Sequence, residues 1–231
     1  MDYTLQFDLT AEDWFLLLNG AWRTIVFSVG GMIVGLAIGI LCAIWRVSGN
    51  VVLRSVAGVY VEFIRNTPIL VQLFIVYFGL PTLGIRLSAD TAAMIALIFN
   101  FGAYATEIVR AGIEAIPRGQ IEAAQSLGLS RWEIYRYVVI LPALERVYPS
   151  LGSQFTLLML GTSIISVIGA SELTAAANSV QSLNFRSFEV YLIATGMYLI
   201  LTLGFRMLLS FVSVLLFPRR RAVGVASQQV A

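Results

Sequence analysis

An uninterrupted apolar run near the start of the chain sets the strongest limit on how it can fold. Ile25–Ile44 carries no ionisable side chain except the weakly acidic thiol of Cys42. At about 1.5 Å per residue, a helix of this length crosses a hydrocarbon core of roughly 30 Å. Hydrophobic residues make up 58% of the chain and charged residues only 12%, against roughly 25% charged in a soluble domain. The sequence therefore predicts an all-α integral membrane protein, since a β-barrel would show shorter alternating segments.

Four more apolar segments bring the expected number of transmembrane helices to five. A single membrane domain accommodates them all, so the chain is expected to form one unit over 1–231. The five expected spans are Ala21–Trp45, Val56–Leu80, Thr91–Arg110, Val147–Ala170 and Val190–Phe217.

The placement of the basic residues orients these spans. The chain contains no lysine and no histidine, so all 15 of its basic residues are arginine. The positive-inside rule assigns arginine-rich connections to the cytoplasm. An acidic N-terminal segment over 1–20 is then periplasmic, the helical core covers 21–217, and a flexible tail over 218–231 is cytoplasmic. The arginines that decide this are Arg46 and Arg54, then Arg110, Arg118, Arg131, Arg136 and Arg146, and finally Arg219–Arg221.

Small residues in the first span predict a close helix contact. Gly31, Gly35 and Gly39 follow one another at four-residue spacing, which puts them on one face of a helix. Glycines placed in this way let a second helix approach closely.

A polar insert over 117–136 interrupts the apolar sequence and is expected on the cytoplasmic side. Pro117 precedes a short helix that ends at Gly128, where a left-handed cap is expected. Ser130 and Glu133 form a capping-box pattern that starts a second helix. An amphipathic segment on the bilayer surface is one reading, but its polar face would then be basic. Gln120, Glu122 and Gln125 make this polar face neutral to acidic, which favours docking into a protein groove. The apolar face of the first helix is expected to consist of Ile121, Ala124 and Leu127.

The insert resembles a known motif. EAAQSLG (Glu122–Gly128), followed by Leu141–Pro142, is similar to the EAA loop of importer-type ABC permeases, which forms a coupling helix that docks on a cytoplasmic ATPase subunit. The rest of the chain resembles the polar amino-acid uptake subfamily, in NGAWRTIVFS (Asn19–Ser28), EFIRNTPILVQLFIVYFGLP (Glu62–Pro81), TSIISVIGASEL (Thr162–Leu173) and FEVY (Phe188–Tyr191). The coupling residues that the resemblance implies are Glu122, Ala123, Ala124, Ser126, Leu127, Gly128 and Arg131.

This resemblance implies a type I ABC importer-like permease fold and a function. The chain is expected to be a subunit that moves a polar or charged amino acid from periplasm to cytoplasm through the bacterial inner membrane. Its implied partners are two copies of an ATP-binding subunit, a second permease that is identical or paralogous, and a periplasmic substrate-binding protein. No nucleic-acid partner is expected. A secondary transporter or channel for small polar solutes is the alternative.

No catalytic site is expected in this chain. A phosphate-binding P-loop needs a lysine, and the chain has none. Without histidine, and with Cys42 as the single cysteine, it can assemble neither a catalytic triad nor a histidine-ligated metal site. It is therefore expected to be a non-catalytic subunit with no metal or cofactor of its own, while ATP and Mg²⁺ bind the partner ATPase.

Polar residues at membrane depth are the candidates for a substrate pathway. Pro68 removes a backbone donor, so a broken helix with unpaired backbone groups is expected beside Asn66 and Thr67. Transporters use such breaks to hold substrates. The alternative is a helix that simply begins at Pro68. The full candidate set is Arg65, Asn66, Thr67, Pro68, Gln72, Asn100, Tyr104, Gly161, Thr162 and Ser163, of which the hydroxyl groups could instead bond their own helix.

Charged residues near the cytoplasmic ends of the spans are interpreted as gate or interfacial groups, and Glu62 and Arg65 are expected near the start of the second span. Glu62 with Arg65, and Glu107 with Arg110, have the spacing for local ion pairs. Arg206 lies inside the fifth span and needs a partner, such as Glu107 or a backbone carbonyl.

The chain departs from the family pattern at three places, the last of which bears on the substrate. Pro142 lies one residue further from the glycine than usual, and Asn66 replaces a glycine. Leu160–Gly161 stands where many relatives carry Lys-Asp or similar polar residues. Basic, acidic, neutral and sulfur-containing amino acids and opine-like derivatives all stay open as substrates. Basic substrates would need a carboxylate, for which only Glu107 and Glu172 are near. Acidic substrates would need an arginine such as Arg65 or Arg206.

Overall fold

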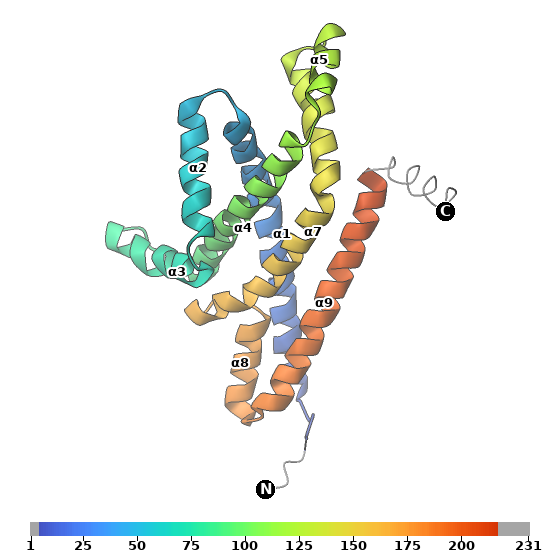
Figure 1. The fold of residues 1–231 in the computed structure, drawn as a ribbon. Coiled ribbons are helices and arrows are strands. Elements are labelled where there is room, and N and C mark those ends of the chain that lie inside the picture. Colours follow the sequence, from blue (N-terminus) through green and yellow to red (C-terminus); the bar gives the residue numbers. More distant parts are fainter. Residues whose placement is uncertain (1–4, 217–231) are drawn as a thin grey trace, which may run out of the picture.

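The computed structural model describes residues 5–216, and within that range all regular structure is helical (Figure 1). The expected tail, with Arg219–Arg221, lies outside the described residues. The α-helices are α1 (Ala11–Val47), α2 (Val51–Arg65), α3 (Ile69–Phe74), α4 (Ala89–Glu114), α5 (Arg118–Ser126), α6 (Arg131–Glu133), α7 (Leu141–Gly161), α8 (Leu173–Asn184) and α9 (Ser187–Leu216). Two π-helical segments, η1 (Ile75–Gly79) and η3 (Ile134–Ile140), and two 3-10 segments, η2 (Leu80–Leu83) and η4 (Thr162–Ile168), complete the set.

The expected number of spans is confirmed when one bent pair is counted as a span. Among residues 5–216, four helices are long and apolar enough to cross a membrane, namely α1, α4, the continuous helix Arg131–Ile168 and α9. The fifth consists of Val51–Arg65 and Ile69–Leu83, which meet at 107°. The expected span Val56–Leu80 is therefore not one straight helix. Pro68 explains the break, because it caps the start of α3 and cannot continue the hydrogen-bond ladder of α2.

The first helix is longer than the apolar run alone indicates. A capping box between Thr10 and Asp13 starts α1 ten residues before the expected boundary at Ala21. The added turns are stabilised by packing, since Leu17 is fully buried against Leu173 and other residues of α8 and α9. Helix α8 was not expected from the sequence, and it follows Gly169, whose φ of +79° ends η4.

The contact between α1 and α4 forms the centre of the fold. A Cβ atom on Gly39 would lie 2.6 Å from the Cβ atom of Ala105, and one on Gly35 would lie 2.8 Å from Phe101 Cδ1. Both distances are shorter than carbon atoms in contact allow, so only glycine fits at these positions. The close helix contact predicted from the glycine spacing is confirmed.

The fourth span begins earlier than Val147, because helix runs without interruption from Arg131 to Ile168. Pro142 does not end this helix. It lies in the first turn of α7, directly after π-helical η3, where the wider turn changes the hydrogen-bond register. The one-residue shift of Pro142 is thus accommodated inside a continuous helix.

Candidate functional site

The short helix α5 lies at the tip of the fold, at the far end from α8 and the start of α1 (Figure 1). Its local structure agrees with the sequence prediction. Pro117 caps its start, and Gly128 follows its end with a φ of +74°. The N–H of Gly128 donates to Gln125 O at 2.9 Å, and the N–H of Leu129 donates to Ala124 O at 3.2 Å. These bonds satisfy the last carbonyl groups of α5 and turn the chain toward the next helix.

The expected capping box after this turn is present. The N–H of Glu133 donates to Ser130 Oγ at 3.3 Å, and the N–H of Ser130 donates to Glu133 Oε2 at 2.8 Å. The two residues thus satisfy each other's backbone donors and fix the start of the helix Arg131–Ile168. The segment from α5 to Glu133 is therefore held by local hydrogen bonds, although most of it is exposed.

The two faces of α5 differ in what they contact. Ile121 and Ala124 pack against Ile134 and Val139 of the long helix, so Ala124 is buried within the chain. Leu127 was expected on the same face, but it is 80% exposed, because it lies beyond the last helical residue of α5. Of the proposed coupling residues, the exposed ones are Glu122, Ala123, Ser126, Leu127, Gly128 and Arg131.

Gln72 organises the break between α2 and α3. This side chain is 6% exposed, and its Nε2 donates to Ile64 O at 2.7 Å and to Thr67 O at 2.9 Å. Its Oε1 accepts from Asn100 Nδ2 at 3.0 Å. The structure therefore brings Gln72 and Asn100, both named as pathway candidates, into contact with each other.

The carbonyl groups at the break are paired within the chain. Thr67 Oγ1 donates to Phe63 O at 2.8 Å, and Asn66 Nδ2 donates to Glu62 O at 2.8 Å. The expectation of unpaired backbone groups here is wrong, because Thr67, Asn66 and Gln72 supply the missing donors. At the break, Arg65, Asn66 and Pro68 are exposed and remain accessible to a substrate.

The polar residues at the end of α7 bond their own helix. Thr162 is fully buried and donates to Met159 O at 2.7 Å, while Ser163 donates to Leu160 O at 2.8 Å. The alternative of local bonding is confirmed for both hydroxyl groups. Gly161 differs, because no atom lies within 4 Å of where its Cβ would be.

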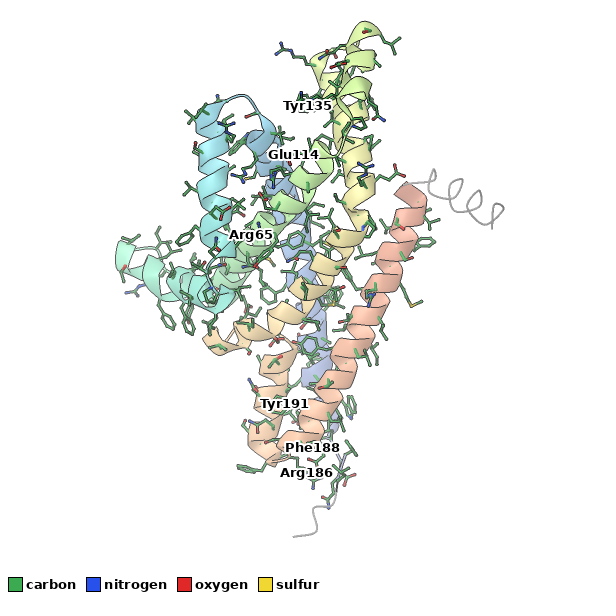
Figure 2. The ribbon with its side chains drawn as sticks, viewed as in Figure 1. Arg65, Glu114, Tyr135, Arg186, Phe188 and Tyr191 are labelled. Carbon is green, nitrogen blue, oxygen red and sulfur yellow. The ribbon has the colours of Figure 1, made fainter. Side chains whose placement is uncertain are left out.

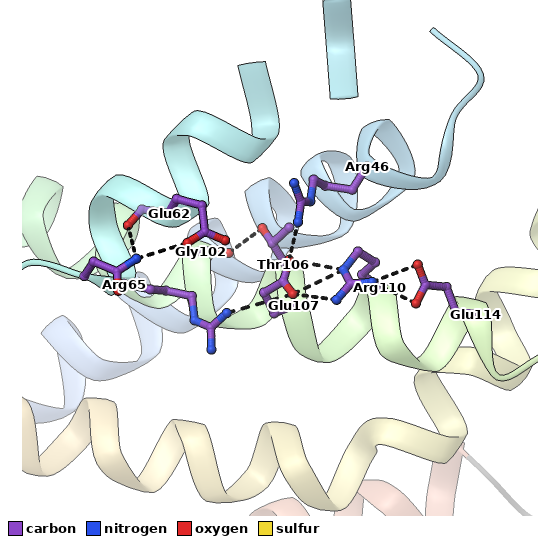
Figure 3. Close-up of polar contacts among 9 residues, drawn as sticks. Arg46, Glu62, Arg65, Gly102, Thr106, Glu107, Arg110 and Glu114 are labelled. Atoms are coloured by element: carbon purple, nitrogen blue, oxygen red, sulfur yellow. Dashed lines mark hydrogen bonds and ion pairs between the residues drawn. The ribbon is translucent and has the colours of Figure 1, made fainter. Parts of the chain in front are cut away.

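A cluster of charged side chains ties three helices together near the break (Figure 3). Glu107 of α4 contacts Arg110 at 2.7 Å, Arg46 of α1 at 3.5 Å and Arg65 of α2 at 3.9 Å. Arg110 also contacts Glu114 at 2.7 Å. The predicted Glu107–Arg110 pair is confirmed. The sequence did not indicate that Arg46 joins this cluster, because its contact with α4 is tertiary. Arg46 was instead assigned to a loop between two spans.

The second predicted pair is wrong. Arg65 pairs with Glu107, and it also lies over the ring of Tyr104, with 5.5 Å between Cζ and the ring centroid. Glu62 instead accepts from Asn66 Nδ2 at 3.0 Å. The sequence placed Glu62 and Arg65 near the start of a span. They lie at the far end of α2, so Arg65 is about 21 Å along the helix axis from Val51.

Arg206 remains exposed in the middle of α9. Within residues 5–216 it makes no ion pair, so the suggested pairing with Glu107 is wrong. It lines a cavity of about 480 Å³ between α7 and α9 together with Thr156, Ser210 and Ser213. A guanidinium group that faced lipid in the middle of a transmembrane helix would be costly.

Polar contacts at the opposite end of the fold were missed by sequence reasoning. Arg23 Nη1 lies 2.9 Å from Asp90 Oδ2, and Asp90 Oδ1 accepts from the N–H of Ser171 at 3.0 Å. Glu172 is 1% exposed, accepts from Tyr198 Oη at 2.5 Å, and its burial raises the pKa of the carboxyl group. Partners so distant along the chain leave no local pattern that could have revealed them.

Comparisons with known proteins agree with this architecture. Residues 35–222 match the family model described as the binding-protein-dependent transport system inner membrane component. The chain is 42% identical over 190 residues to the glutamine transport system permease protein GlnP of Escherichia coli K12, covering 81% of this chain and 87% of that protein. It is 33% identical over 192 residues to the probable glutamine ABC transporter permease protein GlnM of Bacillus subtilis, covering 83% and 89% respectively.

Solved structures show the same fold. The crystal structure of an amino acid ABC transporter with histidines aligns with a TM-score of 0.82 at 37% identity, covering 91% of this chain and 99% of that chain. An inward-facing conformation of the MetNI methionine ABC transporter aligns with a TM-score of 0.72 at 19% identity, covering 90% and 99%. The second likeness concerns the fold alone.

Proposed function

The chain belongs to the family of binding-protein-dependent transport system inner membrane components, and we propose that it imports a neutral polar amino acid. Its relatives are ABC transporter permeases, so it is a multi-pass membrane permease and not a soluble enzyme. Two relatives carry names that refer to glutamine, which makes glutamine the first substrate to test. The proposed location is the bacterial inner membrane, with the N-terminus outside and α5 in the cytoplasm.

The observation that carries this proposal is the exposed helix α5 and the glycine turn that ends it. The exposed residues of α5 have few contacts within the chain, and a partner protein that binds there would contact them. We propose that two ATP-binding subunits, which hold ATP and Mg²⁺, each dock on such a helix. Because α5 packs on Ile134 and Val139, and a capping box starts the helix Arg131–Ile168 directly after the turn, a displacement of α5 would move that helix within the membrane.

The proposed substrate pathway runs past the helix break. Arg65 and Asn66 are exposed there, and Gly161 has open space beside it. Neither nearby carboxylate is available for a cationic substrate, because Glu107 is held by three arginines and Glu172 is buried. This favours a neutral substrate. A second permease, identical or paralogous, would close the pathway, and a periplasmic binding protein would deliver the amino acid.

Substitution of Gly128 tests the proposal. Gly128→Val forces a branched side chain into a backbone with φ of +74°, so the turn after α5 must change. We expect ATP-dependent glutamine uptake into proteoliposomes to fall at least tenfold and the ATPase subunit to be lost on co-purification. Gly49→Val is the matched control, since Gly49 has an ordinary φ and no atom within 4 Å of its would-be Cβ. Unchanged uptake by Gly128→Val, or uptake that needs a proton gradient and no ATP, would contradict the proposal.

A further inference from the structure

An apolar groove lies between the last turns of α1 and the beginning of the long helix Arg131–Ile168. Its volume is about 660 Å³, and its wall is almost wholly apolar. Ile40 and Ile44 of α1 form one side, and Trp132, Tyr135 and Leu141 form the other. Figure 2 shows Tyr135 in the part of the fold that carries α5, far from Arg186 and Phe188 at the other end.

The described part of the chain leaves this groove open. Ile134 and Val139 pack against Ala124, so α5 covers a different side of the same helix. Trp132 is 71% exposed and Tyr135 is 39% exposed, although both are large aromatic residues. An open apolar groove bordered by exposed aromatic side chains needs an apolar occupant, since water would be a poor solvent for its wall.

The groove lies where the membrane is expected to end. The apolar run of α1 stops at Arg46, two residues after Ile44. Tryptophan and tyrosine gather at the boundary between hydrocarbon and headgroups, and Trp132 and Tyr135 sit at this level of the fold. The deeper wall, formed by Ile40 and Leu141, is aliphatic. The groove is thus expected to run from the interfacial layer into the hydrocarbon layer.

Two arginines stand at the rim of the groove. Arg131 and Arg136 line it, and because its wall is almost wholly apolar, they contribute the hydrocarbon parts of their side chains and leave their guanidinium groups at the edge. Neither forms an ion pair with a residue in the range 5–216, whereas Arg46 and Arg110 are paired with Glu107. Arg136 lies over the ring of Tyr137, at 5.4 Å. The rim therefore carries two positive charges without a carboxylate to balance them.

We propose that this groove is a binding site for an anionic phospholipid of the adjacent leaflet. The phosphate would lie at Arg131 and Arg136, and an acyl chain would lie along Ile40, Ile44 and Leu141. The pairing of an apolar wall with two unbalanced cations at its outer edge matches the two ends of such a lipid. The proposal rests on the membrane position of the chain. Arg131 is shared with the proposed ATPase-coupling set, whereas Arg136 is not, so the single variant Arg136→Gln tests the lipid site apart from the ATPase.

Native mass spectrometry of the full chain in detergent tests the proposal, with palmitoyl-oleoyl phosphatidylglycerol and phosphatidylcholine as the probes. The wild type is expected to retain phosphatidylglycerol in preference. The double variant Arg131→Gln, Arg136→Gln should lower the affinity for phosphatidylglycerol about 25-fold, and Arg136→Gln alone about fivefold, as expected from the usual contribution of one arginine near a charged surface. Binding of phosphatidylcholine should not change.

The control variant is Arg54→Gln, which removes an exposed arginine on the same side of the fold but outside the groove. It should retain phosphatidylglycerol like the wild type. Ile44→Trp provides a second test that keeps both charges, because it fills the apolar part and should reduce retention of both lipids. Equal retention by the wild type and Arg136→Gln would overturn the proposal. An equal loss of phosphatidylglycerol in Arg54→Gln would also overturn it. The same holds if the double variant loses a bound protein and retains its lipid.

Discussion

The α1–α4 contact and the segment from α5 to Glu133 both depend on glycine, but for opposite reasons. Gly39 is required because Ala105 stands 2.6 Å from where its Cβ would be. At Gly128, no neighbouring atom lies within 4 Å of where a Cβ would be, and glycine is required there by the φ of +74°. The first region is determined by a neighbour inside the chain, and the second by the path of its own backbone.

This difference separates residues that stabilise the fold from residues that serve a partner. In the α1–α4 contact, nearly every side chain packs against another residue of the same chain. In α5, Ile121 and Ala124 have such partners, while Glu122 and Ser126 face outward, as does Leu127 directly after the helix. Substitutions in the first region should therefore change stability, and substitutions in the second should change transport while the chain remains folded.

The largest effect on stability is expected from Gly39→Leu. The new side chain would overlap Ala105 and the backbone of Thr106, neither of which can move away easily, so we expect a loss of about 3 kcal/mol or more. Thermal unfolding in detergent, followed by size-exclusion chromatography, measures it. Gly204→Leu is the control, since that glycine of α9 has no atom within 4 Å of its would-be Cβ. Similar melting of both variants would show that the α1–α4 contact does not require glycine at position 39.

Gln72→Leu extends the comparison to the helix break. This substitution leaves the carbonyl of Ile64 and the amide of Asn100 without their partner, and we expect a loss of about 2 kcal/mol. Gln154→Leu removes an amide for which no hydrogen bond to residues 5–216 is found, and it should be nearly neutral. Thermal unfolding of the two variants side by side gives the difference. A stable Gln72→Leu would show that water replaces the amide.

Glu107→Gln tests whether the charge cluster belongs to the fold or to a gate. Three arginines would lose their shared carboxylate, which is 17% exposed, so we expect a loss of about 1.5 kcal/mol. Glu114→Gln, at a side chain 54% exposed, should cost no more than about 0.5 kcal/mol. If Glu107→Gln leaves the melting temperature unchanged but alters uptake, the cluster acts as a gate.

The smallest effect is expected from Ser130→Ala, at the junction of α5 with the long helix. Loss of the capping hydroxyl should cost about 1 kcal/mol locally. Amide hydrogen exchange should therefore rise near 130–133, while the melting temperature of the chain stays within error. Ser126→Ala is the matched control, because that hydroxyl donates only to the carbonyl of Glu122 in its own helix. Increased exchange in the α1–α4 contact would show that the two regions are coupled.

Local patterns predicted the parts of this protein that depend on neighbours in sequence. The capping box at Ser130, the left-handed turn at Gly128 and the Glu107–Arg110 pair all involve residues within four positions of each other. The glycine spacing in α1 also predicted a close contact, because it places small residues on one face whatever the partner is. The break at Pro68 follows from the missing backbone donor.

Partners and angles were beyond the reach of the sequence. It predicted where α2 ends but not the 107° bend, nor that Gln72 would pair the carbonyl groups at the break. It assigned Arg65 to Glu62, whereas the structure pairs Arg65 with Glu107 from another helix.

Apolar length and arginine placement alone thus determined that the chain is a helical membrane protein, because water and hydrocarbon act on each segment separately. Which polar groups meet inside was decided only by the tertiary structure, since a buried donor pairs with whatever acceptor the packing brings within reach.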